Sequence, residues 1–528
     1  MKVSWRDLAL ACLSGVLLIP SFPKFDLGAL AWVALVPLLV ALEGKRLLSA
    51  FLLSFATGLI FLPGLFYWVL TVEDYNALDH ILLAVYFSCY FAVFGLALAW
   101  IRKRTDVPLV VAAPPLWVAL EYLRAHAGFL TLPWMLLGYS QYLEPSLVQI
   151  TSLTGVYGLS FLIVLTNALG ADAVRYWRRA RGLPRASSLF PRSLVLSAVT
   201  VSGLLVSTYV YGRIVLSHPL PHERMRIALV QGNVPQQGAG RQRVVDHYAS
   251  LTRTAAQGAP VLIVWPETAV PGDVKHDPQL QQKMRLLARE TEKFLLVGAS
   301  ESAKFSKGNP PNRALQHKYY NSMLLLSPRG TLDGEYRKMI LVPFGEYEPL
   351  QGMIAWPRAI AASFGRMVPG DSYTLFSIDG VRFGAVICWE VIFPDLFREF
   401  VKRGAGFMIN ATNESWFGPT ATPYQLLAMA TIRAAENRVA VARAANTGLS
   451  AFIDPYGRIT DRVRDATGRE LFVEGVLVHD VPVSRTRTFY TRHGDIFAFL
   501  QIGLAAAVVA YGWRPRWLRL ARRTELPV

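Results

Sequence analysis

The sequence predicts a multi-span α-helical membrane bundle joined to an α/β domain that lies outside the membrane. Apolar residues make up 53% of the 528-residue chain and charged residues only 17%, whereas soluble domains carry about 25% charged residues. Long apolar runs fill the first 212 residues and return near the end, while segment 213–492 is built of shorter patterns. We therefore expect a bundle over 1–212, a soluble domain over 213–492, and a final span with a basic tail over 493–528.

Eight apolar segments are candidate membrane spans, because each approaches the roughly 20 residues that a helix needs to cross a bilayer. The second and fifth are short or interrupted by proline, so a count of seven spans remains open. The eight segments are 7–22, 27–43, 48–69, 80–101, 107–123, 149–173, 193–212 and 493–513.

The positive charge of the chain follows these candidate spans. Lysine and arginine cluster before the first span and after the second, fourth, sixth and last, while the connection 70–79 has neither. Cytoplasmic loops of membrane proteins carry the excess of basic residues, so eight spans place every cluster on one side. Both termini are then cytoplasmic, and segment 213–492 lies outside. This distribution accounts for much of the net charge of +17 without a nucleic-acid partner.

Segment 213–492 shows the alternation of strands and helices that is typical of a layered α/β domain. Apolar runs of strand length alternate with stretches of helical spacing. We expect strands at 225–231, 261–264, 294–298, 322–326, 381–387 and 406–410, and helices at 279–292 and 423–437.

Three polar motifs in this domain carry the candidate chemistry. They are Trp265-Pro266-Glu267-Thr268, Tyr336-Arg337-Lys338 followed by Glu346, and Ile387-Cys388-Trp389-Glu390. A thiol attacks a carbonyl as thiolate and needs a base, and the tetrahedral intermediate needs positive charge or N–H donors at its oxyanion. Glutamate, lysine and cysteine therefore suffice without a metal or a cofactor. The three cysteines form no Cys-x-x-Cys pair, so we expect neither a zinc site nor a disulfide framework.

The order and separation of the three motifs resemble the carbon–nitrogen hydrolase (nitrilase) superfamily. The resemblance implies an αββα sandwich in which Glu267 is the general base, Lys338 stabilises the oxyanion and Cys388 is the nucleophile. It also implies supporting roles for Glu346 and Glu390, and an oxyanion donor in the backbone N–H of Trp389.

Further motifs, spread over nearly the whole chain, narrow the resemblance to the apolipoprotein N-acyltransferase family. They are Phe22-Pro23-Lys24-Phe25, the run from Leu30 to Pro37, Pro133-Trp134, Gly138-Tyr139-Ser140-Gln141, the run from Gln231 to Gln236, the run from Asn410 to Gly418, and the run from Arg443 to Gly448.

This narrower resemblance implies the reaction and its partners. An acyl chain would pass from a membrane phospholipid, such as phosphatidylethanolamine, to a Cys388 thioester. The N-terminal amine of S-diacylglyceryl-cysteine in an apolipoprotein would then accept it, as the last step of lipoprotein maturation. The resemblance also implies a multi-pass protein of the bacterial inner membrane, with its catalytic domain on the periplasmic side.

Two positions depart from the family pattern. The family commonly has tyrosine after the nucleophile, whereas Trp389 stands here, so the aromatic ring is kept but the hydroxyl is lost, which puts any hydrogen bond from it in doubt. The family often has tryptophan shortly after the strand that ends near Gln236. The stretch Gln237-Gly238-Ala239-Gly240-Arg241 has none, which puts a substrate contact there in doubt.

Several residues keep a second interpretation. Cys388 alone would be a small buried hydrophobe, and Lys338 alone a solvated lysine. Trp416 and Phe417 are either acyl-chain contacts or packing residues, and the loop with Gly138 and Tyr139 either touches substrate or anchors at the interface. Segment 350–368 is either an apolar lid or a buried helix, and we favour the lid.

Two rival functions also follow from the sequence. The first is a membrane-anchored amidase that uses the same triad, with water in place of the amine. The second is a transporter or binding protein with an inactive enzyme domain. Transport proteins carry charges inside their spans, and the candidate spans here are almost free of them.

Overall fold

The computed structural model describes residues 3–72, 75–180, 191–235, 240–302, 319–350, 353 and 367–513. The chain divides into two compact units. The first comprises Met1–Tyr67, Ala77–Arg213 and Asp495–Val528, and the second comprises Trp68–Asn76 and Ile214–Gly494. The short segment 68–76, expected to belong to the bundle, is therefore part of the second unit. Each unit is described by itself below.

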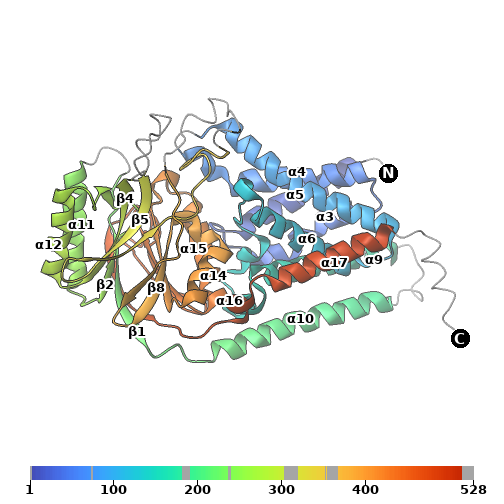
Figure 1. Ribbon diagram of the computed structural model, residues 1–528. Helices are drawn as coiled ribbons and strands as arrows, with labels where there is room; N and C mark the ends of the chain where they lie inside the picture. Colours follow the sequence, from blue (N-terminus) through green and yellow to red (C-terminus); the bar gives the residue numbers. More distant parts are fainter. Residues whose placement is uncertain are drawn as a thin grey trace. The chain divides into compact units, whose positions relative to one another are not determined.

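The first unit is all-helical (Figure 1). Its elements are α1 (Trp5–Leu18), η1 (Ile19–Ser21), η2 (Gly28–Leu30), α2 (Ala31–Ala34), α3 (Val36–Ala41), α4 (Leu47–Leu65), α5 (Ala77–Arg104), α6 (Leu109–Ala125), η4 (Gly128–Leu130), η5 (Leu137–Gln141), α7 (Pro145–Val148), α8 (Thr151–Thr154), α9 (Val156–Ala180), α10 (Arg192–Leu216) and α17 (Ile496–Trp513); η3 (Tyr67–Thr71) begins at its boundary.

Within the described residues, five helices are long and apolar enough to cross a membrane: α4, α5, α9, α10 and α17. The other three expected spans are shorter or interrupted. Helix α1 has 14 residues and α6 has 17, and the segment 28–41 is divided among η2, α2 and α3. The count of eight spans therefore stays a prediction.

The interruption near Leu35 is compensated by a polar side chain from another helix. Pro37 lies at the start of α3, and proline has no N–H to continue a helix. The side chain of Asn167, fully buried in α9, accepts from the N–H groups of Leu35 (2.8 Å) and Val36 (3.1 Å) and donates to the carbonyl of Ala31 (2.9 Å). Irregular backbone is tolerated at membrane depth only where protein satisfies it in this way.

The second unit is an αββα sandwich, as the sequence predicts. Its first sheet has the order β13-β1-β2-β4-β5-β6, with β3 beside β4, and its second has the order β12-β11-β10-β9-β8-β7. The strands are β1 (Arg224–Gln231), β2 (Leu262–Val264), β3 (Val270–Asp273), β4 (Phe294–Ser302), β5 (Tyr319–Leu326), β6 (Leu332–Arg337), β7 (Leu375–Ile378), β8 (Val381–Ile387), β9 (Phe407–Thr412), β10 (Ala440–Ala445), β11 (Ala451–Ile453), β12 (Ile459–Arg462) and β13 (Gly475–Pro482).

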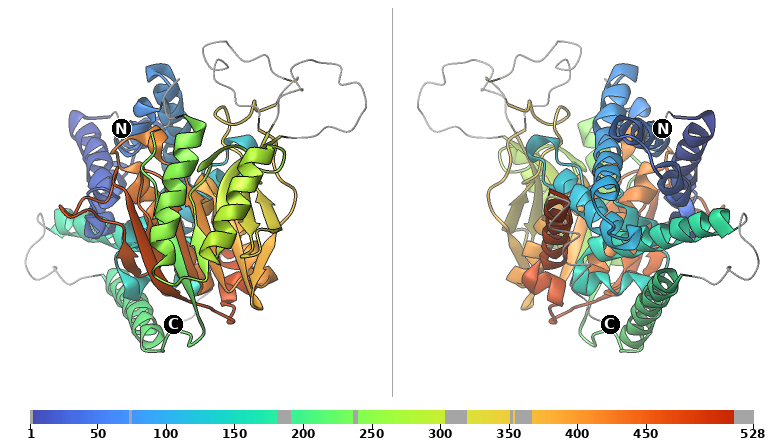
Figure 2. Two further views of the ribbon diagram at one scale, coloured as in Figure 1. Left: turned by 90° about the vertical axis from the view of Figure 1, so that its left-hand side faces the viewer. Right: turned by 90° about the vertical axis from the view of Figure 1, so that its right-hand side faces the viewer.

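Helices cover the outer face of each sheet. α11 (Arg241–Ala256) and α12 (Pro278–Thr291) pack on the first sheet and lie side by side in Figure 2, while α14 (Pro394–Arg403) and α15 (Thr422–Asn437) pack on the second. The remaining elements are η8 (Cys388–Ile392), η9 (Ser415–Phe417) and α16 (Phe489–His493). The inner strands β9 and β10 are buried along their whole length, as parallel strands between two layers must be.

The pattern of α12 shows how the sequence places these covering helices. The carboxylate of Asp277 accepts from the N–H groups of Gln279 and Leu280 and so caps the first turn. Leu280, Met284 and Leu287 recur at helical spacing and are buried in the core between the helices and the first sheet.

Candidate active site

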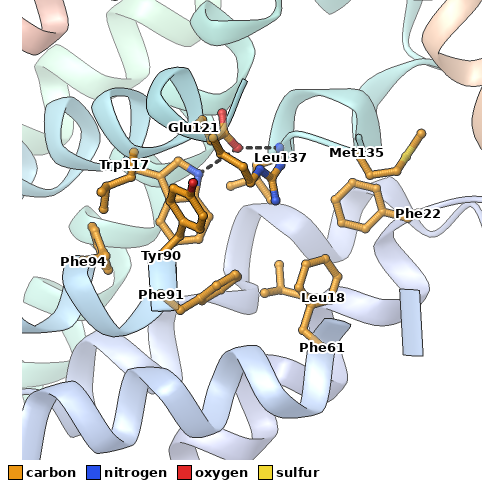
Figure 3. Close-up of a pocket in the computed structure, with 12 residues that line it drawn as sticks. Leu18, Phe22, Phe61, Tyr90, Phe91, Phe94, Trp117, Glu121, Met135 and Leu137 are labelled. Atoms are coloured by element: carbon orange, nitrogen blue, oxygen red, sulfur yellow. Dashed lines mark hydrogen bonds between the residues drawn. The ribbon is translucent and has the colours of Figure 1, made fainter. Parts of the chain in front are cut away.

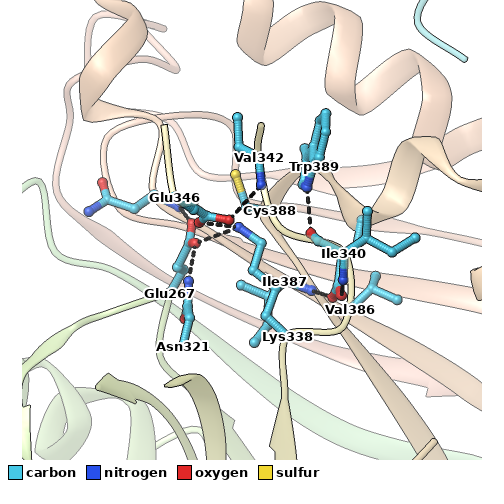
Figure 4. Close-up of polar contacts among 12 residues, drawn as sticks. Glu267, Asn321, Lys338, Ile340, Val342, Glu346, Val386, Ile387, Cys388 and Trp389 are labelled. Carbon is cyan, nitrogen blue, oxygen red and sulfur yellow. Dashed lines mark hydrogen bonds and ion pairs between the residues drawn. The ribbon is translucent and has the colours of Figure 1, made fainter. Parts of the chain in front are cut away.

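Three strand ends bring Glu267, Lys338 and Cys388 together (Figure 4). Glu267 follows β2, Lys338 follows β6, and Cys388 follows β8. Their exposed fractions are 6%, 1% and 8%. A solvated lysine is thereby excluded for Lys338, because an ammonium is buried only when it has partners.

Glu267 is held by donors from three neighbouring segments. Its Oε1 accepts from the side-chain amide of Asn321 (2.7 Å) and from Lys338 Nζ (3.4 Å), and its Oε2 accepts from the backbone N–H of Asn413 (2.8 Å). The backbone at Glu267 also presses against β4, where a Cβ on Gly298 would lie only 2.1 Å from the carbonyl oxygen of Pro266. Only glycine allows this approach, so Gly298 lets the backbone of Glu267 lie directly against β4.

Lys338 lies between two carboxylates. Its Nζ donates to Glu346 Oε1 (2.6 Å) and to Glu267 Oε1 (3.4 Å), and Glu346 Oε2 accepts from the N–H of Val342 (2.8 Å). Burial alone would lower the pKa of Lys338, but the charges of Glu346 and Glu267 outweigh burial and raise this pKa. The cation that the two carboxylates hold is therefore the lysine ammonium itself, and it keeps a third N–H to donate.

Cys388 has a left-handed backbone conformation, with φ +53°, at the point where β8 turns into η8. Non-glycine residues adopt this conformation at a cost, and the surrounding structure must enforce it. Burial and the charge of Glu267 raise the pKa of the Cys388 thiol above its usual range, while Lys338 and the hydroxyl of Thr412 oppose the rise. The resting side chain is therefore a thiol, and its proton must leave during any attack on a carbonyl.

Glu390 connects the segment 338–340, which follows β6, to the end of β8. Its two oxygens accept from the hydroxyl of Tyr336 and from the N–H groups of Met339 (2.7 Å), Ile340 (3.0 Å) and Ile387 (2.7 Å). Burial raises the pKa of Glu390 to about 7, and the backbone donors oppose that rise. These contacts stabilise the site, since they fix the backbone segments that carry Lys338 and Cys388.

Trp389 makes a hydrogen bond that a tyrosine would not reproduce in the same way. Its indole N–H donates to the carbonyl of Ile340 at 2.6 Å, and its ring packs edge-on against Phe393. Trp389 is thus hydrogen-bonded to the segment 338–340 through its ring nitrogen.

Trp416 and Phe417 follow the Asn413 segment. Trp416 is 42% exposed, whereas Phe417 is half-buried and packs edge-on against Trp68, with ring centroids 5.2 Å apart. Trp68 donates in turn to Gln425 Oε1 at 3.2 Å. Phe417 is therefore engaged in packing, and Trp416 offers the free apolar face; a substrate contact for either stays a prediction.

Gly138 and Tyr139 lie in the interior of the helical unit. Tyr139 is fully buried, and a Cβ on Gly138 would meet the carbonyl of Val156 at 2.6 Å. A substrate contact there stays a prediction.

A small pocket in the helical unit is lined by aromatic side chains such as Phe61 and Phe94 (Figure 3). At one end Glu121, inside an expected span, accepts from Trp117 Nε1 (3.0 Å) and the N–H of Leu137 (2.7 Å). Arg124, one turn further along α6, also lines the pocket and donates to the carbonyl of Trp134 at 3.1 Å.

Sequence reasoning gave no role to Asn321, Gly298 or Asn413, which position Glu267. Asn413 belongs to a motif that the resemblance had singled out, whereas one polar residue at the start of a strand and one glycine within a strand carry no pattern of their own. Most of the expected lid, 350–368, lies outside the described residues, as does 236–239, where the tryptophan is missing.

Two family models match the chain. Residues 14–169 match the apolipoprotein N-acyltransferase N-terminal domain, and residues 226–490 match carbon-nitrogen hydrolase.

Curated relatives match over nearly the whole length. A protein from Geobacter metallireducens named apolipoprotein N-acyltransferase is 38% identical, and the match covers 96% of this chain and 96% of the relative. One of the same name from Chlorobaculum tepidum is 30% identical, over 95% of this chain and 96% of the relative. Among solved structures, an amidase from Nesterenkonia sp. AN1 is 20% identical with a TM-score of 0.38, covering 51% of this chain and 96% of that chain.

Proposed function

The chain belongs to the apolipoprotein N-acyltransferase family, and on that premise we propose that it acylates the N-terminal amine of apolipoproteins with Cys388 as the acyl carrier. The observation that carries the residue assignment is the Lys338 ammonium, held between Glu267 and Glu346 beside a buried cysteine. This arrangement supplies a base, a cation and a nucleophile in one place.

In the first half-reaction, Glu267 takes the Sγ proton as the sulfur attacks the ester carbonyl of a membrane phospholipid. The carbonyl oxygen becomes an oxyanion, which accepts hydrogen bonds from Lys338 Nζ and the N–H of Trp389. Collapse of the intermediate breaks the ester C–O bond. The lysophospholipid oxygen leaves with the proton from Glu267, and the acyl group remains on Cys388 as a thioester.

In the second half-reaction, the amine of an S-diacylglyceryl-cysteine attacks the thioester carbonyl. Glu267 takes a proton from the attacking nitrogen, and the same two donors hold the new oxyanion. The C–S bond then breaks, an amide forms, and the Cys388 sulfur recovers its proton from Glu267. The cycle returns Glu267 and Cys388 to their starting protonation states and consumes only the phospholipid and the amine.

The membrane setting supports a lipid donor. The protein is a membrane-bound enzyme of several apolar helices. We place it in the bacterial inner membrane with both termini cytoplasmic and the sandwich on the periplasmic side, where the diacylglyceryl acceptor would meet it. The basic clusters support this orientation.

The rival amidase accounts for less of the chain. A hydrolase domain explains residues 226–490, but the relatives that match the helical region as well are named for acyl transfer. The rivals also differ in the molecule that resolves the thioester, which is water for an amidase and an amine for a transferase.

The test is product formation by the purified protein in lipid nanodiscs. With phosphatidylethanolamine and a synthetic S-diacylglyceryl-cysteine peptide, mass spectrometry should show the peptide gaining one acyl chain and one lysophospholipid appearing per turnover. An N-acetylated version of the same peptide is the matched control and should gain nothing. Free fatty acid released at equal rates with and without the peptide would instead establish the hydrolase.

A further inference from the structure

The backbone turn at Cys388 is held from the neighbouring strand by one side chain. Asn410, on β9, lies opposite Val386 in the parallel pairing of β8 and β9. Its amide nitrogen donates to the carbonyl of Cys388 at 3.2 Å and to the carbonyl of Val386 at 3.3 Å. The two carbonyls flank the residue at which the chain leaves the strand, so this amide fixes the direction of the turn.

The orientation of that amide is set by Arg443 on β10. One guanidinium nitrogen of Arg443 donates to Asn410 Oδ1, and another donates to Glu414 Oε1. A guanidinium can only donate, so Oδ1 must face Arg443 and the NH₂ group must face the two carbonyls. The arginine therefore determines which end of Asn410 reaches the cysteine.

Glu414 completes the network and anchors it. Its second oxygen accepts from the N–H of Leu449 at 3.2 Å, and a Cβ on Gly448 would overlap that oxygen at 1.5 Å. Asn410, Glu414 and Arg443 are all fully buried. The same stretch of chain also contacts the other side of the site, because the N–H of Asn413 donates to Glu267 Oε2.

We infer that Asn410 and Arg443 are positioning residues for acyl transfer, which hold Cys388 in its left-handed conformation so that its sulfur faces Glu267 and Lys338. The inference rests on the proposed role of Cys388 as the acyl carrier. Neither residue touches the reacting atoms; Asn410 acts through the Cys388 carbonyl, and Arg443 acts through Asn410.

Asn410→Asp separates positioning from general stability. The carboxylate keeps an acceptor for Arg443 but loses the NH₂ donor, and it faces the Cys388 carbonyl with like partial charge. Asn437→Asp is the matched control: Asn437 is also fully buried, its Nδ2 donates to the carbonyl of Arg433 (3.1 Å), and its Oδ1 accepts from Thr491 (2.9 Å). Arg443→Lys adds a conservative variant that keeps the positive charge but has one nitrogen, where the guanidinium has two that donate separately to Asn410 and Glu414.

The experiment uses the full chain and two readouts, the first in detergent without phospholipid and the second in nanodiscs. The first is the rate of Cys388 alkylation by iodoacetamide across pH, resolved from Cys12 and Cys89 by peptide mass mapping. The second is kcat and KM for acyl transfer. For Asn410→Asp we expect alkylation and kcat to fall at least tenfold with KM within twofold, and Arg443→Lys to fall between this variant and wild type. Asn437→Asp should keep both rates within threefold.

Two results would overturn the inference: wild-type alkylation and kcat in Asn410→Asp, or equal losses in Asn410→Asp and Asn437→Asp at similar melting temperatures. The alkylation is measured in detergent without a phospholipid donor, so it is separate from the proposed function. If wild-type protein transfers no acyl group but its alkylation depends on Asn410, the proposed function fails and the positioning of Cys388 stands.

Discussion

The pKa of the Cys388 thiol is shifted by two charges of opposite sign, those of Glu267 and Lys338. Burial and Glu267 raise its pKa, and Lys338 and Thr412 lower it. The elevated pKa means that the thiolate is scarce at neutral pH, so a nearby carboxylate must take the proton as the sulfur attacks. Glu267 and Lys338 therefore have different roles before a substrate is bound: the carboxylate accepts the thiol proton, and the ammonium stabilises the thiolate.

The two charges should shift the alkylation of Cys388 in opposite directions along the pH axis. In Glu267→Gln the loss of negative charge lowers the thiol pKa, so the midpoint of the rate–pH curve moves to lower pH. In Lys338→Met the loss of positive charge raises the thiol pKa, so the midpoint moves to higher pH. Both variants should lose acyl transfer by at least 100-fold, consistent with general-base and oxyanion contributions of roughly that size.

Stopped iodoacetamide reactions between pH 6 and pH 11 give the displacement of each midpoint, because below the midpoint the rate follows the thiolate fraction and the whole curve shifts along the pH axis. Glu348→Gln is the control, because it removes a carboxylate two residues from Glu346 that, among the described residues, makes no hydrogen bond to Glu267 or Lys338, and its midpoint should match wild type. Midpoints that move in the same direction for both site variants would contradict the charge arrangement.

At the scale of single elements, the strand ends carry the site, and β4 approaches the Pro266–Thr268 backbone closely. Gly298→Ala would put a Cβ within 2.1 Å of the Pro266 carbonyl oxygen, so Glu267 must shift. Overpacking of this kind costs about 1–3 kcal/mol, and a displacement of about 1 Å costs roughly 100-fold in rate.

We therefore expect Gly298→Ala to fold, with a lowered melting temperature and about 100-fold slower acyl transfer. Gly240→Ala is the control, because a Cβ there meets no atom of the described residues within 4 Å. Activity within twofold of wild type for Gly298→Ala would show that the Glu267 backbone is not constrained by β4.

The broken span 28–41 depends on one side chain from α9. Asn167→Leu would leave the N–H groups of Leu35 and Val36 without their buried acceptor, at roughly 1–3 kcal/mol for each group. We expect a clear fall in melting temperature in detergent. Thr166→Ala is the neighbouring control, since its hydroxyl donates within its own helix, to the carbonyl of Leu162. Equal melting temperatures for the two variants would contradict the compensating role of Asn167.

The sequence predicted strands β1, β2, β4, β5, β8 and β9 and helices α12 and α15 because their patterns are local, and it missed the other strands and helices of the sandwich. The expected strand 381–387 agrees with β8 at both ends, and the expected helix 423–437 differs from α15 by one residue. The Glu267, Lys338 and Cys388 set was also predicted, since each stands in a recognisable motif. The contacts of Asn321, Asn410 and Arg443 were not, because they join residues far apart in the chain and depend on the order of the strands in the sheets.

At the scale of the whole molecule, the basic clusters predict which side of the membrane each part faces. In spheroplasts of a Cys89→Ser strain, a membrane-impermeant maleimide should label Ser377→Cys, at an exposed position of β7, without permeabilisation. Lys103→Cys, at the end of α5, should be labelled only after permeabilisation. The reverse pattern would place the sandwich in the cytoplasm and contradict the orientation.

The proposed acyl transfer requires Cys388 to carry the acyl group. The most direct test is the intact mass of the purified protein after incubation with phosphatidylethanolamine of one defined acyl composition and no acceptor. We predict a single added acyl chain that hydroxylamine removes, present in wild type and Cys89→Ala and absent in Cys388→Ala. An adduct that survives in Cys388→Ala, or a wild type that consumes the phospholipid without acquiring an adduct, would contradict Cys388 as the acyl carrier.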